Sequence, residues 1–308
     1  MKKGLVIKST GSWFTVKTED GNIINCKIKG KIRTQDIKST NPVAVGDWVE
    51  IEMVDSQTGV IFNIQERKNY LIRKASNLSK QSQVIAANLD RALLVVTLIF
   101  PETSLEFIDR FLASAEAYRI PVTIILNKTD LYENTLPALV SDIHNMYEPI
   151  GYPVIETSVP QNKNLDQLKA VLLNKVCVMA GNSGVGKSTL INSIFPGLKL
   201  RTGEISDYHM KGKHTTTFAE MVELPEGGYI IDTPGIKGFG MVHMDKKEIY
   251  HFFPEIFKYA SSCQYYNCLH MEEPKCAVKK AVEDGNIFAS RYYSYQSIVN
   301  DQQTKYRK

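Results

Sequence analysis

The chain has 308 residues, of which 43% are hydrophobic, and its formal net charge at pH 7 is +4. This length suffices for two or three domains with buried cores, and the mild positive charge permits an anionic partner without requiring one. No apolar run approaches the roughly 20 residues of a membrane-spanning helix, and the start of the chain does not resemble a signal peptide, so we expect a cytoplasmic protein.

Short strands separated by turn residues are predicted up to about residue 66, a pattern typical of a small five-stranded barrel. The expected strands are 4–9, 13–18, 23–32, 47–54 and 59–64. The third strand carries cations at alternate positions, namely Lys27, Lys29, Lys31 and Arg33. The pleat would place them on one face, which suits a phosphate backbone, although a solvated strand surface explains the same pattern.

From about residue 67 to 240 the pattern alternates between strands and helices, which predicts a parallel α/β sheet. Helices are expected around 105–115 and 165–173 and from Lys187 onward. The expected strands are 92–99, 122–126, 153–157, 176–180 and two more that end at Asp232.

Residues 181–189 match the pattern of a phosphate-binding loop, between an apolar strand and the start of a helix, as this pattern requires. Glycines recur because backbone N–H groups must wrap around the α and β phosphates. Lys187 is expected to reach the β and γ phosphate oxygens, and Ser188 to ligate Mg²⁺. The nucleotide-binding residues predicted here are Gly181, Asn182, Ser183, Gly184, Val185, Gly186, Lys187, Ser188 and Thr189.

A short Asp-Thr-Pro-Gly segment follows the last predicted strand of this block. Asp232 is therefore expected at the carboxyl edge of the sheet, where it can hold Mg²⁺ through water. Gly235 would offer its N–H to the γ phosphate. Alone the string is a common turn, but in this position it indicates a switch that responds to the γ phosphate.

Asn127, Lys128, Thr129 and Asp130 follow another apolar strand and predict recognition of guanine. The Asp130 carboxylate can accept hydrogen bonds from N1–H and from the exocyclic amine of guanine, a pair of donors that adenine lacks. Asn127 is expected to support the other edge of the base, and the stem of Lys128 to cover the ring.

Thr157 and Ser158 end a further strand and are expected to place a backbone N–H near the guanine O6.

The order of the motifs differs from that of ordinary GTPases, in which the base-reading motif follows the phosphate loop. In this chain the base-reading motif precedes the phosphate loop. Chain termini commonly lie close together at the surface, so a permuted order can preserve the packed sheet. We therefore predict a circularly permuted P-loop GTPase domain whose switch runs directly into the C-terminal part of the chain.

Three of the five cysteines lie close to a histidine, in the set Cys263, Cys268, His270 and Cys276. Such crowding in a reducing compartment favours metal ligation over disulfides. Three thiolates and one imidazole form a full tetrahedral set for one structural Zn²⁺. Unligated cysteines near a surface histidine are the alternative interpretation. Aromatic and basic residues around the cluster suit RNA contacts, and core tyrosines with solvated lysines explain them nearly as well.

With these motifs the chain resembles the circularly permuted bacterial GTPases known as ribosome small subunit-dependent GTPase A, the RsgA family. The likeness covers nearly the whole sequence and includes Gly46-Asp47, residues 85–90 and the threonine run at 215–217. The resemblance implies GTP hydrolysis to GDP and phosphate, stimulation by the small (30S) ribosomal subunit, contacts with 16S rRNA and a role in late maturation of that subunit.

The patterns along the chain, together with the resemblance, predict three domains. Residues 1–66 would form an RNA-binding barrel of the OB type, residues 67–240 the permuted GTPase domain, and residues 241–308 a mainly helical, zinc-binding domain.

Many GTPases orient the attacking water with a glutamine just after the switch, a place held here by Ile236, which cannot hydrogen-bond water. In the similar family a histidine before the threonine run is implicated, which in this chain is His214. The alternative is that His214 only touches phosphate or solvent. One of Thr215, Thr216 and Thr217 is expected to sense Mg²⁺.

The sequence as a whole predicts a Mg²⁺-dependent GTPase with slow intrinsic turnover, accelerated when the small subunit orders the segment with His214. The expected partners are GTP or GDP, the 30S subunit and 16S rRNA but no membrane, and the chain is expected to be a monomer. One alternative is a non-enzymatic RNA-binding protein that GTP stabilises, against which Lys187, Ser188 and Asp232 argue. Another is a GTPase that acts on a membrane or a protein partner.

Overall fold

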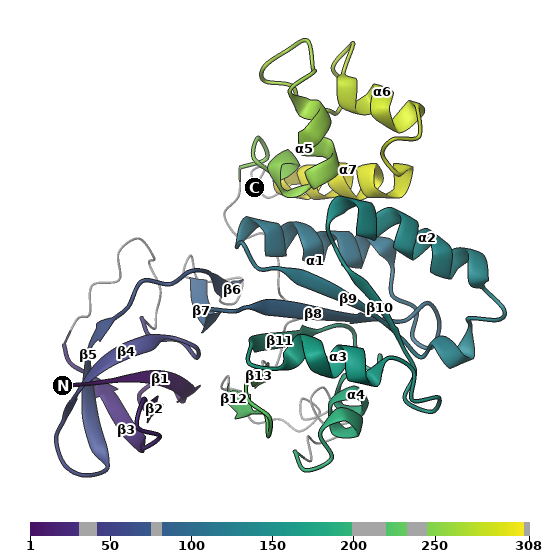
Figure 1. The fold of residues 1–308 in the computed structure, drawn as a ribbon. Helices are drawn as coiled ribbons and strands as arrows, with labels where there is room; N and C mark the ends of the chain where they lie inside the picture. Colours follow the sequence, from purple (N-terminus) through teal and green to yellow (C-terminus); the bar gives the residue numbers. More distant parts are fainter. Residues whose placement is uncertain (31–41, 75–81, 199–219, 233–244, 305–308) are drawn as a thin grey trace.

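The computed structural model of the chain describes residues 1–30, 42–74, 82–198, 220–232 and 245–304. A barrel, an α/β layer and a small helical part follow one another along the chain (Figure 1). The strands are β1 (Lys2–Ser9), β2 (Phe14–Thr18), β3 (Ile23–Ile28), β4 (Trp48–Met53), β5 (Thr58–Ile64), β6 (Tyr70–Lys74), β7 (Ser82–Ala87), β8 (Arg91–Val96), β9 (Val122–Asn127), β10 (Val154–Thr157), β11 (Val176–Ala180), β12 (Glu220–Glu223) and β13 (Tyr229–Asp232).

One sheet of 11 strands runs through both the α/β layer and the barrel, in the order β10-β9-β8-β11-β13-β12-β1-β2-β3-β5-β4. Strands β10, β9, β8, β11 and β13 pair in parallel, and β12 is antiparallel to β13. The predicted parallel α/β sheet is thereby confirmed. Strands β6 and β7 form a separate two-stranded ladder, which the sequence pattern did not predict.

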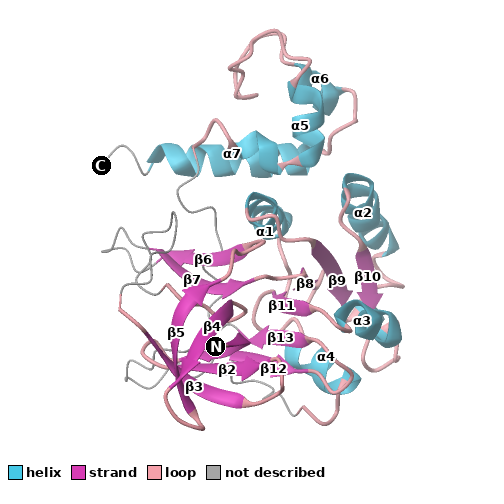
Figure 2. Ribbon diagram, turned by 60° about the vertical axis from the view of Figure 1, so that its left-hand side comes forward, coloured by secondary structure: helices cyan, strands magenta, loops and turns pink. Residues whose placement is uncertain are grey.

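Helices cover both faces of the parallel strands (Figure 2). On β8, Leu94 and Val96 pack in one core with α1 (Leu105–Ala117) and α2 (Pro137–Tyr147). Leu93 and Val95 pack in a second core with α3 (Leu165–Leu172) and α4 (Lys187–Ile194). Successive side chains of a strand point to opposite faces, which is why a strand covered on both sides reads as a continuous apolar run.

The first five strands close into a barrel, since β1 pairs with both β2 and β4. The predicted five-stranded barrel is confirmed, but the expected third strand is too long. Strand β3 ends at Ile28, and Gly30 adopts a left-handed φ of 61°, which an extended strand cannot contain. Of the four alternating cations, β3 holds Lys27, Lys29 follows the strand, and the other two lie outside the described residues.

The barrel packs closely against the α/β layer. Strand β1 pairs with β12 at Lys8 and Glu220, and a Lys17–Glu223 ion pair of 2.6 Å lies beside this ladder. A Cβ atom at Gly46 would lie 2.1 Å from the carbonyl oxygen of Ala87, so only glycine permits this approach of the two backbones. The barrel and the parallel strands therefore form a continuous structure, which no local sequence pattern had indicated.

The C-terminal part is helical and packs on α1. It contains η5 (Ile249–Phe252), α5 (Pro254–Ala260), α6 (Ala277–Glu283) and α7 (Ala289–Thr304). At its base the buried Arg291 donates from Nη1 to Asp109 of α1 at 2.9 Å, and from Nε to Glu255 at 2.7 Å. Tyr147 of α2 also donates to Asp109, at 2.8 Å. Among the described helices, none combines the length and apolarity that crossing a membrane would take.

Replacing Arg291 by Met should destabilise the protein strongly, because Asp109 and Glu255 would stay buried without their cation. We expect the free energy of unfolding to fall by about 3–5 kcal/mol, measured by denaturant titration. Arg110→Met is the matched control, since Arg110 pairs with Glu106 and Asp301 at a half-exposed position and should cost about 1 kcal/mol or less. Equal losses in the two variants would contradict this account.

Candidate nucleotide site and metal centre

The phosphate-loop segment joins the carboxyl end of β11 to α4. Gly181 has a φ of 139°, and a Cβ atom there would lie 2.2 Å from the carbonyl oxygen of Val95. Gly186 has a φ of 97° and caps α4, whose first turn closes with a 2.9 Å bond from Leu190 N to Gly186 O. Both glycines are required by conformation and by close packing, and Asn182, Ser183, Gly184 and Val185 lie between them.

Lys187, Ser188 and Thr189 begin α4, as expected for the residues that follow the loop. The Lys187 ammonium donates to the carbonyl oxygens of Gly181 at 2.9 Å and Asn182 at 2.7 Å. The ammonium therefore lies across the loop, at the N-terminal end of α4. The free backbone N–H groups at such a helix end favour anions.

The Asn127 side chain joins three motifs. It is buried, its Nδ2 donates to the carbonyl oxygen of Val185 at 2.8 Å, and its Oδ1 accepts from the Thr157 hydroxyl at 2.9 Å. Tyr132 donates to the Asn127 carbonyl oxygen at 2.6 Å. Its amide therefore holds the phosphate loop and the two strand-end segments together.

Lys128 extends from the base-reading segment to the phosphate loop. Its Nζ donates to the carbonyl oxygens of Gly184 and Phe100, both at 2.7 Å. The next residue, Thr129, is buried and donates to the carbonyl oxygen of Thr157 at 3.4 Å. Lys128 thus connects the base-reading segment to the phosphate loop.

Asp130 is oriented by Ser158, whose hydroxyl donates to Asp130 Oδ1 at 2.6 Å. Within the described part of the chain, Oδ2 of Asp130 accepts no hydrogen bond. The carboxylate therefore keeps acceptor capacity on both oxygens, since each carries two lone pairs. This arrangement fits the two adjacent donors of guanine.

The switch residues are only partly placed. Strand β13 ends at Asp232 and pairs in parallel with β11, so the backbone of Asp232 lies at the same sheet edge as the phosphate loop. The Asp232 side chain lies outside the described residues, as do His214, Thr215, Thr216 and Gly235.

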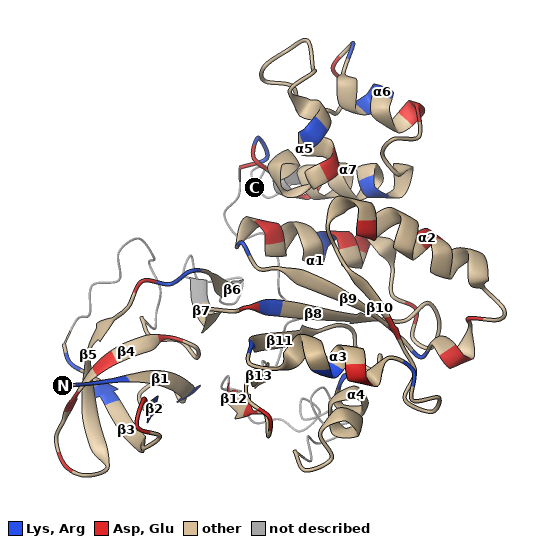
Figure 3. Ribbon diagram, viewed as in Figure 1, with Lys and Arg blue, Asp and Glu red and all other residues tan. Residues whose placement is uncertain are grey.

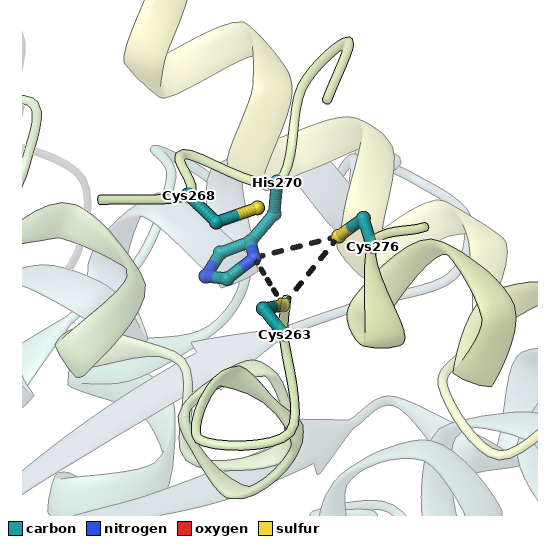
Figure 4. Close-up of side chains that lie close together, drawn as sticks. All are labelled: Cys263, Cys268, His270 and Cys276. Carbon is teal, nitrogen blue, oxygen red and sulfur yellow. Dashed lines mark hydrogen bonds between the residues drawn. The ribbon is translucent and has the colours of Figure 1, made fainter. Parts of the chain in front are cut away.

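The cysteine cluster forms a compact Cys₃His site (Figure 4). The ligand atoms of Cys263, Cys268, His270 and Cys276 all lie within 4.8 Å of one another. The Cys263 and Cys276 sulfurs are 3.8 Å apart, and each lies 3.5 Å from His270 Nδ1. A tetrahedral zinc with Zn–S bonds of about 2.3 Å places neighbouring sulfurs about 3.8 Å apart, so the donor set fits one zinc.

The surroundings of the cluster hold its loops in place. Tyr292 and Tyr295 of α7 donate to the carbonyl oxygens of His270 and Leu269, each at 2.6 Å. Burial raises the pKa of the Cys268 thiol to about 12. A thiolate at this position therefore needs a cation, which a bound zinc supplies.

Sequence reasoning missed several residues that organise the nucleotide site. Lys163, Glu133 and Glu156 form an ion-pair cluster behind Asp130 and Ser158, and the Phe100 carbonyl accepts from Lys128. Their spacing follows no motif, because each contact joins side chains or backbone groups that only the folded chain brings together.

Comparison with known proteins identifies the chain. The RsgA GTPase family profile matches residues 64–242, and the RsgA N-terminal domain profile matches residues 3–61. The chain belongs to the RsgA family. It is therefore a GTP-hydrolysing enzyme.

Curated proteins of the same family align over nearly the whole chain. A small ribosomal subunit biogenesis GTPase RsgA of Phocaeicola vulgatus is 56% identical over 306 residues, which are 99% of both chains. One from Bacteroides fragilis is 55% identical with the same coverage.

Two solved structures support the fold. YjeQ from Thermotoga maritima superposes with a TM-score of 0.80 at 36% identity and covers 97% of this chain and 98% of its own. YloQ, a circularly permuted GTPase, gives 0.75 at 30% identity over 99% and 96%. The predicted permuted GTPase fold is thereby confirmed.

Asp130→Asn should weaken guanine nucleotides, because an amide replaces one acceptor by a donor. We expect GDP affinity to fall about 10- to 100-fold and xanthosine diphosphate to be favoured instead, measured by competition binding. Asp142→Asn, an exposed substitution on α2, is the control and should bind GDP normally. Unchanged GDP affinity in Asp130→Asn would show that another group reads the base.

Metal analysis should find about one zinc per chain, and Cys268→Ser should lose it. Because structural zinc contributes folding free energy directly, this variant should also expose the C-terminal part to protease. Cys26→Ala, buried in the barrel, should retain the metal. A zinc-free wild-type chain with the same protease resistance as Cys268→Ser would overturn the assignment.

Proposed function

We propose that this GTPase acts in biogenesis of the small ribosomal subunit, hydrolysing GTP to GDP and phosphate when it is bound to the 30S particle. The names of the relatives support the ribosomal role. The observation that carries the GTPase site is the side chain of Asn127, which ties the base-reading segment to the phosphate loop and to Thr157.

In this proposal GTP lies along the carboxyl edge of the parallel strands. Asp130 reads guanine, the stem of Lys128 covers the ring, and the segment of Thr157 and Ser158 approaches O6. The loop from Gly181 and the start of α4 bind the phosphates. The contacts of Lys128 with Gly184 and of Ser158 with Asp130 support this placement.

Mg²⁺ would be held by Ser188 and, through water, by Asp232, with one residue of the threonine run at 215–217 as sensor. The position of Ser188 in the first turn of α4 supports this assignment. The ion would offset negative charge on the β and γ phosphates. Gly235 would donate its N–H to the γ phosphate.

The barrel, proposed as an RNA-binding domain over residues 1–66, has a face suited to 16S rRNA. The ammonium of Lys27 lies 4.4 Å from the centre of the Trp13 ring, and Trp13 is 43% exposed. Figure 3 shows basic residues on β1 and β3 and acidic residues on β4. Bases stack on exposed aromatic rings while cations bind phosphates, which is the usual chemistry of single-stranded RNA recognition.

Residues 67–240 would form the GTPase domain and residues 241–308 the zinc domain. The zinc domain would provide a second set of RNA contacts. Tyr265 and Tyr266 are exposed beside the Cys₃His site, which supports this role. Zinc would serve folding, because its four ligands leave no open position. We expect the GTPase to work as a monomer in the cytoplasm.

Hydrolysis should be slow in the free protein and strongly stimulated by purified small subunits, because the partner would order the segment with His214. In single-turnover assays with saturating subunits, His214→Ala should lower the rate by about 10²-fold and leave GTP affinity nearly intact. Ile236→Ala should have much less effect. If subunits do not stimulate the wild type, the ribosomal dependence is wrong; if His214→Ala hydrolyses at the wild-type rate, another group orients the water.

A further inference from the structure

Lys163 lies behind the base-reading residues and contacts both segments that would surround guanine. Its Nζ lies 2.6 Å from Glu133 Oε2, three residues after Asp130, and 2.9 Å from Glu156 Oε2, two residues before Ser158. Its backbone forms two further bonds with Ser158, since Lys163 N donates to Ser158 O at 2.9 Å and Ser158 N to Lys163 O at 3.4 Å. One residue therefore connects the two segments through both its backbone and its side chain.

The contacts continue to the carboxylate that would read the base. Ser158 Oγ donates to Asp130 Oδ1 at 2.6 Å and accepts from the Gln161 backbone N–H at 3.3 Å. Gln161 Nε2 also donates to Glu133 Oε1 at 3.2 Å. The orientation of Asp130 is thus linked through Ser158 to the loop that Lys163 anchors.

Charge makes Lys163 important to this arrangement. Glu133 and Glu156 share its ammonium, and His144 also contacts Glu156, at 3.1 Å. The hydrogen bond from Lys163 lowers the pKa of Glu133, although burial opposes it. The side chain of Lys163 is 31% exposed and those of both glutamates 24%, so water screens these pairs less than it screens fully exposed ones. Without the ammonium, two like charges would face each other between the segments.

We propose that Lys163 is a positioning residue for guanine specificity, which holds Ser158 and the Glu133 segment so that the Asp130 carboxylate meets both guanine donors. This inference rests on the proposed role of Asp130 as the guanine reader. Lys163 itself touches the protein and not the base. Its removal therefore changes the discrimination between bases more than the chemistry of hydrolysis.

Inosine diphosphate provides the probe, because it keeps N1–H of the base and lacks the exocyclic amine. The ratio of GDP to inosine diphosphate affinity then reports the amine contact with Asp130 alone. We expect Lys163→Met to lower this ratio about three- to tenfold, as loss of part of a charge-assisted hydrogen bond would, and to raise the KM for GTP with little change in kcat. Lys163→Arg should recover most of the ratio, since it restores the cation.

The control is Lys169→Met on α3, which removes a lysine paired with Glu226 and not with Glu133 or Glu156, and it should leave the ratio unchanged. If Lys163→Met does not fold, Glu133→Gln is tested in its place. It should also lower the ratio of GDP to inosine diphosphate affinity. Thermal unfolding of each variant without nucleotide separates specificity from stability.

Asp130→Asn distinguishes this inference from the proposed site. If Asp130→Asn abolishes the preference for GDP while a folded Lys163→Met keeps the wild-type ratio, Lys163 has no positioning role and the inference is overturned. If Asp130→Asn itself leaves the ratio unchanged, the base-reading assignment fails and this inference fails with it. A lower ratio in Lys163→Met, recovered in Lys163→Arg, supports both.

Discussion

The buried amide of Asn127 is the contact on which the nucleotide site depends. Its donor is taken by the carbonyl oxygen of Val185 and its acceptor by the hydroxyl of Thr157, so three separate stretches of chain meet at one side chain. Leaving either group unpaired in the core would cost about 1–3 kcal/mol, which favours a single arrangement of these loops. This contact joins segments that meet only in the folded structure. It therefore does not depend on the order of the motifs along the chain.

The permuted order nevertheless changes which parts of the chain adjoin the GTPase sheet. The barrel extends the same sheet through the pairing of β1 with β12, and the zinc-cluster part packs on α1. Arg291 lies between Asp109 and Glu255 and stabilises the second junction. Separating a buried cation from its two carboxylates has a high cost in free energy. The GTPase layer is therefore joined to the barrel and to the helical C-terminal part, and both junctions depend on contacts that are distant in sequence.

Local patterns predicted most of the α/β layer. Strand β11 spans the predicted residues 176–180, and α1 and α4 begin where the periodicity and the glycine loop indicated. Helix α2 was missed because its buried residues are confined to its second half, Ile143, Met146 and Tyr147, so the apolar stripe is short. Strand β3 was predicted too long because alternation continues in the sequence past Gly30, where the backbone conformation no longer permits a strand.

The sequence by itself determined which residue types the candidate sites contain, because the phosphate-loop pattern, the base-reading segment and the Cys₃His set each lie within about fifteen positions of the chain. Only the tertiary structure decided how these groups are supported. Asp109 and Arg291 are 182 positions apart, and Lys163 reaches Glu133 across 30. Such pairs leave no periodic trace in the sequence, since their geometry arises only when packed helices and strands bring distant side chains within hydrogen-bonding distance.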